Sequence, residues 1–533
     1  MSIPEAKTFW ALLEERAAAT PSAPMLIDEH DECISFADYH AAALRVAARL
    51  HARGIGPGSR VSFQLPTRIG TVVLMGGLAR LGAIQNPIVP VYRETETAFC
   101  LDETQAEVLI VEGSGWRLDE ARLRERVGRD FRLLRDREVD IARAEADADR
   151  PPPDATLPPP PVAMLPPPPA DPGEVRWIYY TSGTTSRPKG ARQTDHAVAI
   201  TAAGLVARHR IGPPDRFGMA FPFTHVGGLI NLLATFLRGH CLVLLEAFDA
   251  EKATVHFAKH GVSVVGGGPV FYAAILAEQR RHPERKLLPA FRIFSGGGAP
   301  MNAALHYEVL REMGGRGCLH GFGMTECGII CANDVDDADD RLAETEGRPI
   351  PGIELRIDRA DGAPAEAGEE GEVLLRGPAV CRGYVDPVAT AEAFDAEGWF
   401  RTGDLGFVDA HGYLTITGRR KDVIIRKGEN VSAVEVEDLL YAHPRVADVA
   451  VIGLPDALRG ELVCAVVTAL PGHPPIGFDE MVAHFRSARV MAQKIPERLE
   501  VVDAIPRNAT GKILKQVLKE RFAAPAVPDS SGR

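Results

Sequence analysis

The stretch Val175-Arg-Trp-Ile-Tyr-Tyr180 runs directly into Thr181-Ser-Gly-Thr-Thr-Ser-Arg-Pro-Lys-Gly190. The first part is short, apolar and rich in aromatic residues, which predicts a β-strand. The second part contains five hydroxyl side chains, two glycines, an arginine and a lysine. Glycines let backbone N–H groups converge on an anion, while hydroxyls and a lysine add donors and charge. By itself the stretch fits a phosphate-binding loop and an ordinary polar turn equally well.

The order of residues in this loop argues against the P-loop of kinases and NTPases. A P-loop needs Gly-Lys-Ser/Thr running into the N-terminus of a helix. Here the lysine precedes the glycine, as Lys189-Gly190, and Pro188 precedes the lysine.

Helical and strand periods alternate along much of the chain, which predicts a mainly parallel sheet covered by helices. The predicted helices are an amphipathic N-terminal helix with Phe9, Leu12 and Leu13 inward, 41–52 and 71–81; the predicted strands are 60–65, 108–111, 175–180, 241–245, 263–265 and 291–294. Turn-rich sequence at 372–417 predicts a small β-rich lobe. The predicted fold class is α/β: a large N-terminal domain of mixed, mainly parallel sheets with this lobe, plus a small mobile α+β C-terminal domain.

The length of 533 residues is too great for one ordinary core, so we expect at least two domains. A basic cluster follows Gly418, and we place the boundary there, giving domains 1–418 and 419–533. Proline runs between 151 and 172 predict a polyproline-like surface connector, with a docking ligand for a partner as the alternative.

Composition excludes several classes of protein. The apolar fraction is 45%, the charged fraction 25% and the net charge −12, which indicates a soluble protein without nucleic acid as a main partner. The N-terminus lacks a signal-peptide core, and Pro222 interrupts the longest uncharged run, so we expect no membrane span. Cys327 and Cys331 lack the spacing of a zinc site, and the eight cysteines indicate buried free thiols in the cytoplasm.

Further segments occur in a fixed order and resemble signatures of the adenylate-forming superfamily, as does the loop 181–190. They are Ser295–Pro300, Gly321-Phe-Gly-Met-Thr-Glu326, Trp399-Phe-Arg-Thr-Gly-Asp404, Gly418–Ile424 with Lys427–Asn430, and Pro506-Arg-Asn-Ala-Thr-Gly-Lys512. The matches span roughly residues 8 to 520. The chain is therefore identified as a member of this superfamily.

The resemblance implies a reaction in two steps. A substrate carboxylate attacks the α-phosphorus of ATP and expels pyrophosphate, and a thiol, that of coenzyme A, then displaces AMP from the acyl-adenylate. The first step brings two anions together, so the site must supply cations and hydrogen-bond donors. The resemblance thus implies an AMP-forming acyl-CoA synthetase, an acid–thiol ligase that uses ATP, Mg²⁺ and coenzyme A.

The resemblance also assigns catalytic roles. Lys512 would be the mobile cation that bridges the attacking carboxylate and the α-phosphate. Glu326 would hold Mg²⁺ and Thr325 would donate to the α-phosphate. His225 would lie beside the acyl pocket as a gate or facing the carboxylate.

Other positions carry over as binding residues. The ATP and AMP contacts would be Thr181, Ser182, Gly183, Thr184, Thr185, Lys189, Gly297, Gly298, Ala299, Phe322, Gly323, Met324, Thr325, Asp404, Arg419 and Lys512. Among these, Phe322 would stack on adenine, Asp404 would accept from the ribose hydroxyls, and Arg419 would reach the nucleotide from across the domain boundary. The acyl pocket would contain His225, Val226, Gly227, Gly267 and Gly268; Lys421 would be the hinge, and Lys427 and Gly428 would lie on the coenzyme A side.

Two positions depart from the family pattern. Ser186 stands where the family commonly has glycine, and a positive φ there would cost roughly 1 kcal/mol. Phe322 stands where tyrosine is commoner, which keeps the stacking face and loses a hydroxyl.

The choice of acid rests on the pocket segments. The stretch Phe221–His225 lacks the aspartate with which peptide-synthetase domains hold an amino group, while 224–230 and 264–271 are apolar and glycine-rich. Small residues leave volume, which favours a medium-chain fatty acid or a bulky cyclic or aryl acid. The alternatives are an acyl-AMP ligase that loads a carrier protein and a non-catalytic nucleotide or adenylate sensor on the same fold. Monomer and homodimer both remain open.

Overall fold

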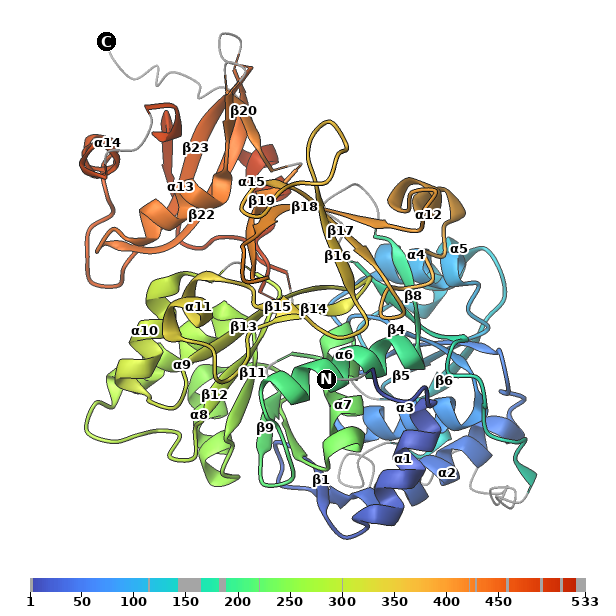
Figure 1. Cartoon of the computed structure of the whole chain (residues 1–533). Helices are drawn as coiled ribbons and strands as arrows, with labels where there is room; N and C mark the ends of the chain where they lie inside the picture. Colours follow the sequence, from blue (N-terminus) through green and yellow to red (C-terminus); the bar gives the residue numbers. More distant parts are fainter. Residues whose placement is uncertain are drawn as a thin grey trace. The chain divides into compact units, whose positions relative to one another are not determined.

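The computed structural model describes residues 3–113, 116–141, 164–181, 188–219, 221–299, 301–420, 422–426, 429–456, 460–488, 492–508 and 511–523. Contacts divide the chain into two compact units, the first made of Met1–Leu355 and Leu375–Phe400, the second of Arg356–Leu374 and Arg401–Arg533. Figure 1 shows the elements of both. The domain boundary after Gly418 stays a prediction, since the contact division falls earlier in the chain.

The first unit contains a nine-stranded sheet. Its strands in spatial order are β15 (Arg348–Pro349), β14 (Gly328–Ala332), β13 (Cys318–Met324), β12 (Ile293–Gly297), β11 (Val264–Gly267), β9 (Arg216–Met219), β10 (Cys241–Leu244), β1 (Pro24–Ile27) and β2 (Cys33–Ser35). The six strands from β13 to β1 are parallel, and antiparallel strands flank them at both edges.

A six-stranded sheet in the same unit has the order β6 (Arg132–Arg135), β5 (Val108–Val111), β3 (Arg60–Gln64), β4 (Ile84–Pro87), β7 (Val175–Tyr180) and β8 (Gly190–Thr194). Its pairs are parallel except for β7 and β8. The helices of this unit are α1 (Phe9–Ala19), α2 (Phe36–Ala52), α3 (Ile69–Leu81), α4 (Glu94–Thr104), α5 (Glu120–Val127), α6 (Asp195–Arg208), α7 (Val226–Arg238), α8 (Ala250–Lys259), α9 (Pro269–Arg281), α10 (Ala303–Glu312), α11 (Asp339–Glu344) and α12 (Pro387–Ala393), with a 3₁₀ turn at Asp136–Val139.

Glycines let α2 and α3 pack closely. A Cβ on Gly76 would come 2.7 Å from the Tyr39 hydroxyl, and one on Gly77 would come 2.7 Å from Cγ1 of Val46. The Tyr39 hydroxyl then reaches the Val72 carbonyl at 2.9 Å. Helix α3 ends at Gly82, whose φ of 68° is one that glycine adopts without steric cost.

A buried carboxylate joins α1 to the second sheet. Asp195, the first residue of α6, accepts a hydrogen bond from the backbone N–H of Phe9 at 2.8 Å and from Nε1 of Trp177 at 2.7 Å. Burial raises its pKa, while the two donors oppose that rise. The predicted N-terminal helix is confirmed, with Phe9, Leu12 and Leu13 buried.

The second unit is a smaller α+β structure. Its four-stranded sheet has the order β16 (Glu354–Asp358), β17 (Gly371–Arg376), β18 (Phe400–Val408) and β19 (Leu414–Arg419). A five-stranded sheet contains β21 (Glu429–Val431), β20 (Ile424–Arg426), β23 (Gly460–Ala469), β22 (Val446–Asp456) and β24 (Arg498–Val501), and the helices are α13 (Ala433–Tyr441), α14 (Phe478–Ser487) and α15 (Lys515–Phe522), with a 3₁₀ turn at Ala492–Lys494. The predicted fold class is confirmed.

The predicted elements occur with shifted ends. Strand β7 has the predicted bounds, whereas α2 begins at Phe36, five residues before the predicted start, because the Ser35 side chain caps it by accepting from the Asp38 N–H. The first part of the proline-rich segment lies outside the described residues. From 164 onward it contacts the first unit, where Arg80 donates to the Pro166 carbonyl at 2.9 Å.

The eight cysteines carry free thiols, as predicted. Cys33 is exposed and the other seven are buried, including Cys327 and Cys331. Within the ranges described above, the helices are too short or too polar to cross a membrane.

We expect Asp195→Asn to lower the free energy of unfolding of the first unit by about 2 kcal/mol, because an amide would set an N–H against one of two buried donors. Urea unfolding followed by tryptophan fluorescence measures the shift in midpoint. The exposed Asp171→Asn change is the control. An unchanged midpoint for Asp195→Asn would show that this carboxylate does not join the segments.

Candidate active site

The predicted phosphate loop is the connection of an antiparallel hairpin. In the pairing of β7 with β8, Tyr180 lies opposite Gly190. The Thr181 N–H donates to the Lys189 carbonyl at 3.0 Å, and the Lys189 N–H donates to Oγ1 of Thr181 at 3.3 Å. A strand follows Gly190 instead of a helix, in agreement with the exclusion of a P-loop. The predicted contacts Ser182, Gly183, Thr184 and Thr185, together with Ser186, lie outside the described residues.

One tyrosine links the loop lysine to the predicted metal ligand. Nζ of Lys189 lies 5.3 Å from the ring centroid of Tyr384, and the Tyr384 hydroxyl donates to Oε1 of Glu326 at 2.6 Å. Tyr384 and Glu326 are both buried. Burial and the adjacent Glu326 carboxylate raise the pKa of Tyr384, so its hydroxyl stays a donor at neutral pH. The Tyr384 side chain therefore lies between the Lys189 ammonium and the Glu326 carboxylate and contacts both.

The backbone of Thr325 and Glu326 is held by two other segments. These residues form the turn between β13 and β14, where Gly328 has a φ of 63°. Nε2 of Gln193 donates to the Thr325 carbonyl at 2.7 Å, and the Cys381 N–H donates to the Glu326 carbonyl at 2.7 Å. The turn is thus attached to β8, the strand that leaves the phosphate loop.

The segment that carries Tyr384 runs beside β8. The Arg192 N–H donates to the Gly383 carbonyl at 2.9 Å, and the Val385 N–H donates to the Gly190 carbonyl at 2.8 Å. The loop stem, the 325–326 turn and the 381–385 segment therefore form one hydrogen-bonded assembly.

The parallel strands β11, β12 and β13 have glycines at or near their carboxyl ends. Gly267 pairs with Gly296, and Gly297 pairs with Gly321. A Cβ on Gly297 would meet the Gly321 carbonyl oxygen at 2.0 Å. A Cβ on Gly268 would lie 3.0 Å from the Gly297 carbonyl oxygen, so the predicted acyl-pocket glycine borders the predicted adenine-side turn. In open α/β sheets, ligands bind at the carboxyl ends of the strands.

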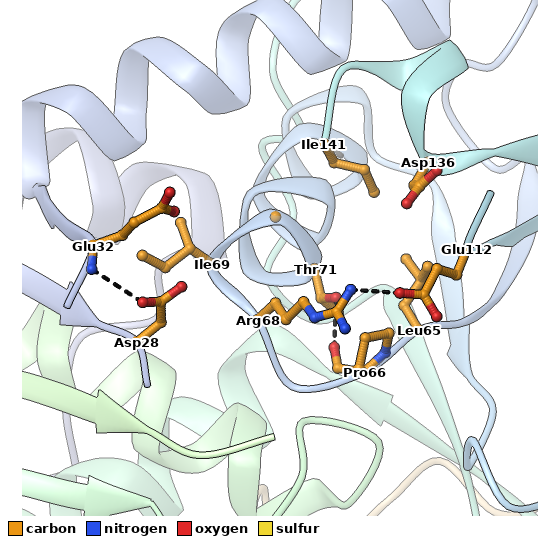
Figure 2. A pocket seen from close by; sticks show the side chains of 11 residues that line it. Asp28, Glu32, Leu65, Pro66, Arg68, Ile69, Thr71, Glu112, Asp136 and Ile141 are labelled. Atoms are coloured by element: carbon orange, nitrogen blue, oxygen red, sulfur yellow. Dashed lines mark hydrogen bonds and ion pairs between the residues drawn. The ribbon is translucent and has the colours of Figure 1, made fainter. Parts of the chain in front are cut away.

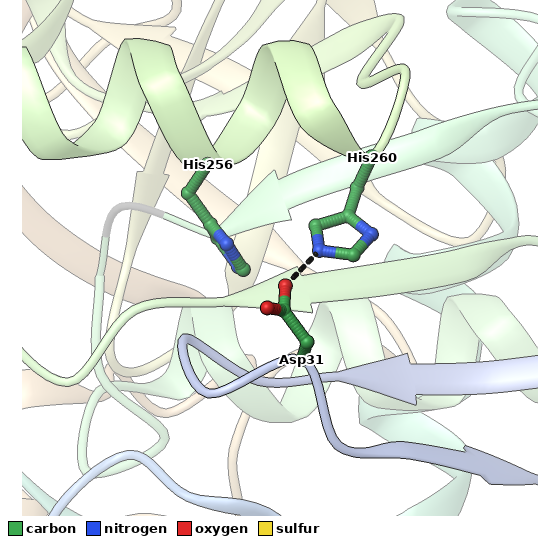
Figure 3. Close-up of side chains that lie close together, drawn as sticks. All are labelled: Asp31, His256 and His260. Carbon is green, nitrogen blue, oxygen red and sulfur yellow. Dashed lines mark hydrogen bonds and ion pairs between the residues drawn. The ribbon is translucent and has the colours of Figure 1, made fainter.

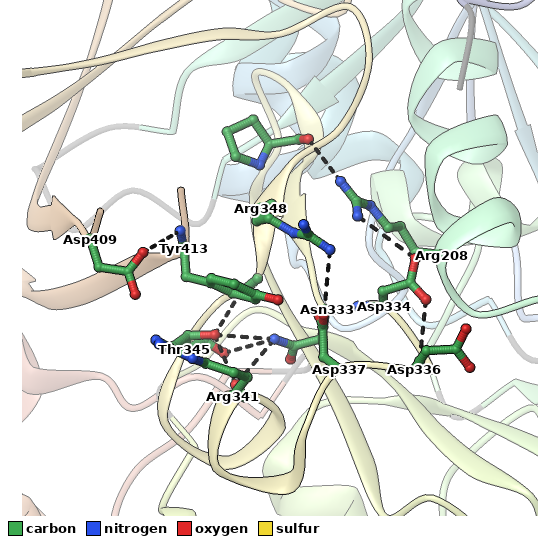
Figure 4. Close-up of polar contacts among 12 residues, drawn as sticks. Arg208, Asn333, Asp334, Asp336, Asp337, Arg341, Thr345, Arg348, Asp409 and Tyr413 are labelled. Atoms are coloured by element: carbon green, nitrogen blue, oxygen red, sulfur yellow. Dashed lines mark hydrogen bonds and ion pairs between the residues drawn. The ribbon is translucent and has the colours of Figure 1, made fainter. Parts of the chain in front are cut away.

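A buried polar cluster braces the base of β13. The Asn333 side chain accepts from the His320 N–H at 3.1 Å, and its Nδ2 donates to the carbonyls of Arg341 and Thr345 at 3.3 Å each (Figure 4). Nε2 of His320 lies 3.1 Å from Oε2 of Glu346. These contacts hold the strand that carries Phe322, Gly323 and Met324.

His225 lies at the N-terminus of α7. Its Nδ1 accepts from the Gly227 N–H at 3.1 Å, so the residue caps the helix. The Tyr179 hydroxyl donates to the Phe223 carbonyl at 3.2 Å and ties this end of α7 to β7. Val226 and Gly227 belong to the same first turn. The gate role of His225 stays a prediction beside this structural role.

In the second unit, Asp404 and Arg419 form an ion pair. They lie opposite one another on β18 and β19, with Nε of Arg419 2.9 Å from Oδ1 of the buried Asp404. We expected Arg419 to come from across the boundary, but it shares a sheet with Asp404. Strand β19 continues past Gly418 to Arg419, so Asp404 and Arg419 lie in one β-hairpin.

The Lys512 turn is fixed within the second unit. The Lys512 N–H donates to Oδ1 of Asn508 at 2.9 Å, and Gly511 has a φ of 82°. Nη1 of Arg507 donates to the Gly511 carbonyl at 2.6 Å, while its Nη2 contacts both oxygens of Asp448 at 2.8 Å. Because the planar guanidinium of Arg507 binds the Gly511 carbonyl and the Asp448 carboxylate at once, it orients the turn more firmly than a lysine would.

The remaining predicted residues Lys421, Lys427 and Gly428 lie outside the described residues. Gly298 and Ala299 follow β12, and Gly298 has a φ of 88° that favours glycine.

A small hollow lies at the carboxyl ends of β3 and β5 (Figure 2). Asp28, Glu112 and Asp136 line it together with Arg68, and Arg68 is paired with Glu112 and Glu246. None of the residues predicted for ATP or acid lines this hollow. Asp28 accepts from the backbone N–H groups of His30 and Glu32. We assign this hollow no part in the reaction.

Sequence reasoning missed Tyr384 and Gln193. Neither lies in a recognised motif, and both act through contacts between segments far apart in the chain. The nearest signal was the turn Cys381-Arg-Gly-Tyr384 inside the predicted β-rich stretch. It suggested no partner for Glu326.

Two family models match the chain: that of the AMP-binding enzymes over residues 13–385 and that of the AMP-binding enzyme C-terminal domain over residues 435–512. The chain belongs to the AMP-binding enzyme family. Together with the ligases and nucleotide-bound structures that it resembles, this makes the chain an AMP-forming acyl-CoA synthetase, an acid–thiol ligase that uses ATP, Mg²⁺ and coenzyme A, as the sequence resemblance implied.

Relatives support this class along the whole chain. A long-chain-fatty-acid–CoA ligase of Mycobacterium tuberculosis is 32% identical over 96% of this chain and 98% of its own length. A second ligase of that organism, named for a propanoyl acid with a methyl-dioxo-octahydroindenyl ring system, is 34% identical over 97% of this chain and 99% of its own. The ATP-bound structure of MatB from Rhodopseudomonas palustris superposes with a TM-score of 0.83 at 29% identity, covering 96% of this chain and 98% of that one.

We expect Tyr384→Phe to raise the Mg²⁺ concentration needed for half-maximal pyrophosphate release about tenfold, because Glu326 would lose the donor that orients its carboxylate. The assay titrates MgCl₂ at saturating acid and fixed ATP. Tyr307→Phe removes an exposed hydroxyl and is the matched control. Equal Mg²⁺ requirements in both variants would contradict this orientation by Tyr384.

Proposed function

We propose that this ligase activates a medium-chain fatty acid or a bulky cyclic or aryl acid and transfers it to coenzyme A. The observation that carries the proposal is the glycine-lined end of β11–β13, where Gly268 borders the Gly297 carbonyl. Most of these glycines let neighbouring backbone approach closely, but a Cβ on Gly298, which follows β12, would meet nothing within 4 Å, and this open space beside the nucleotide turn is where an acyl group would fit. The names of the relatives, one for long-chain fatty acids and one for a ring-bearing acid, support this range.

We infer the following division of labour in adenylation. Glu326, oriented by the Tyr384 hydroxyl, would hold Mg²⁺, which would supply positive charge at the phosphates, and Lys189 supplies further positive charge over the Tyr384 ring. Thr325 donates to the α-phosphate, and Phe322 stacks on adenine. These groups offset the repulsion between the substrate carboxylate and the triphosphate.

Residues of the second unit complete the proposal. Lys512 neutralises the charge that develops as the carboxylate oxygen attacks phosphorus, and Arg507 positions its turn. Asp404 accepts from the ribose hydroxyls, since a carboxylate can accept from two hydroxyls at once. Lys421 serves as the hinge, and Lys427 and Gly428 belong to the thiol step.

The proposed compartment is the cytoplasm. Seven buried free thiols are consistent with a reducing environment. The proposed assembly is a monomer or a homodimer, which sedimentation of the purified chain decides.

Lys512→Ala should slow acyl-adenylate formation about 100-fold or more, because the cation acts on charge that develops in the transition state. Thioester formation from a supplied acyl-adenylate should persist. The two steps are measured separately, by pyrophosphate release and by thioester yield. Lys519→Ala, which removes a lysine of α15 without an assigned role, is the control. Equal loss of both steps in Lys512→Ala would contradict the assignment.

The acid is identified with a panel of carboxylic acids of increasing size, each assayed for AMP formation with and without coenzyme A. We expect the highest kcat/KM for acids of about six to twelve carbons or with one or two rings. Acids of roughly this size fit the volume of a typical small-molecule pocket. AMP release should depend on coenzyme A. A preference for acetate would overturn the proposed acid, and turnover that requires a carrier protein would overturn coenzyme A as the acceptor.

A further inference from the structure

Two histidines and an aspartate meet at the end of helix α8. His256 lies in the last turns of α8, and His260 follows the helix as its C-cap. Residues four apart on a helix lie on the same face, so both imidazoles point to one side. Asp31, in the turn between β1 and β2, approaches them from another part of the first unit (Figure 3). None of these three residues has a role in the proposed reaction.

The atoms that could bind a metal ion are already close. Nε2 of His260 lies 2.7 Å from Oδ1 of Asp31, and the imidazole rings of His256 and His260 have centroids 4.8 Å apart. One ligand atom from each of the three residues falls within 4.8 Å of the other two. Ligands of a tetrahedral zinc ion lie about 3.3 Å apart, given Zn–N and Zn–O bonds of about 2.0 Å. Small side-chain rotations reach that geometry.

His256 provides the independent sign of a ligand. Its side chain is 9% exposed, and its Nε2 is buried without a hydrogen-bond partner among the described residues. A buried polar atom without a partner costs free energy, and native structures rarely leave one unsatisfied.

The surroundings favour a cation. The C-terminal end of a helix carries partial negative charge, and His256 and His260 lie at that end of α8. Asp28 and Glu29 lie in the same turn as Asp31. Asp31 has a φ of 66°, a conformation that costs a residue other than glycine some free energy, yet it directs the carboxylate to the histidines. A nearby competitor is Lys259, an exposed side chain paired with the second oxygen of Asp31.

We propose that Asp31, His256 and His260 bind a divalent transition-metal ion of the zinc type, with water in the remaining position. Imidazole with a carboxylate selects zinc and its neighbours over Mg²⁺, which prefers oxygen ligands. The ion joins the β1–β2 turn to the end of α8 and stabilises the first unit. It is a different ion from the Mg²⁺ assigned to Glu326.

The test is a competition titration of the full-length, untagged chain with Zn²⁺ and a chromogenic chelator. We expect one Zn²⁺ per chain, and an affinity at least about tenfold lower in His256→Gln and in Asp31→Asn. Lys259→Ala should bind Zn²⁺ a few-fold more tightly, because its ammonium competes for Asp31. With Co²⁺, the wild-type chain should give the intense visible absorption of a four-coordinate ion.

Two controls address neighbouring groups. His30→Ala removes the histidine of an adjacent cluster with Glu29 and Glu246, and Cys33→Ser removes the exposed thiol. Both should leave Zn²⁺ binding unchanged. Loss of binding in either control but not in His256→Gln would overturn the proposal.

Stability supplies a measurement that does not depend on the variants. Zn²⁺ at 100 times its dissociation constant should raise the melting temperature of the wild-type chain, since binding to the folded state alone stabilises it. Circular dichroism without metal shows whether each variant is folded. Wild-type chain that gains no stability and shows only weak six-coordinate Co²⁺ absorption would establish a metal-free ion-pair cluster instead.

Discussion

The first unit depends on one almost fully buried carboxylate, that of Asp195. Asp195, the first residue of α6, accepts hydrogen bonds from the first backbone N–H of α1 and from the indole of Trp177 in β7. Three elements of the first unit therefore share one carboxylate. Burial raises the pKa of Asp195, and its two donors oppose that rise in part. Strand β7 runs directly into the phosphate loop, and the position of the loop stem therefore follows from this contact.

In the candidate site, too, hydrogen bonds from distant segments hold a functional element in place, and here the donors are neutral groups. The Thr325–Glu326 turn is held through its carbonyls by Gln193 and by the Cys381 N–H, and the Glu326 carboxylate receives the Tyr384 hydroxyl. Because these donors already restrict the conformations of the Glu326 side chain, little conformational entropy is lost when metal or nucleotide binds. Preorganisation of the site therefore comes from Gln193 in β8 and from the 381–385 segment, which lie outside the family motifs quoted above.

Local pattern and motif order were enough to predict the fold class, strand β7 and helix α1, while the roles that motif order assigns to the site residues stay predictions. Ends of elements were less predictable, as with α2, because a capping serine outside the apolar pattern sets the start. Tyr384 reaches Glu326 from a distant segment of the chain, and Arg419 pairs with Asp404 through the register of the β18–β19 hairpin; motif spacing encodes neither contact. His225 shows a further limit, because a polar residue beside a glycine-rich run can cap a helix as well as face a ligand.

The cysteines of the chain can be used to detect local unfolding, because most of their thiols are buried in the folded protein. Cys33 alone among the eight cysteines is exposed, so an alkylating reagent would mark it first. Modification of any further thiol requires local or global opening, whose free energy sets the rate of labelling. Cys464 belongs to the second unit and the other buried cysteines to the first. Mass spectrometry of timed alkylation could thus resolve the fluctuations of each unit without any introduced label.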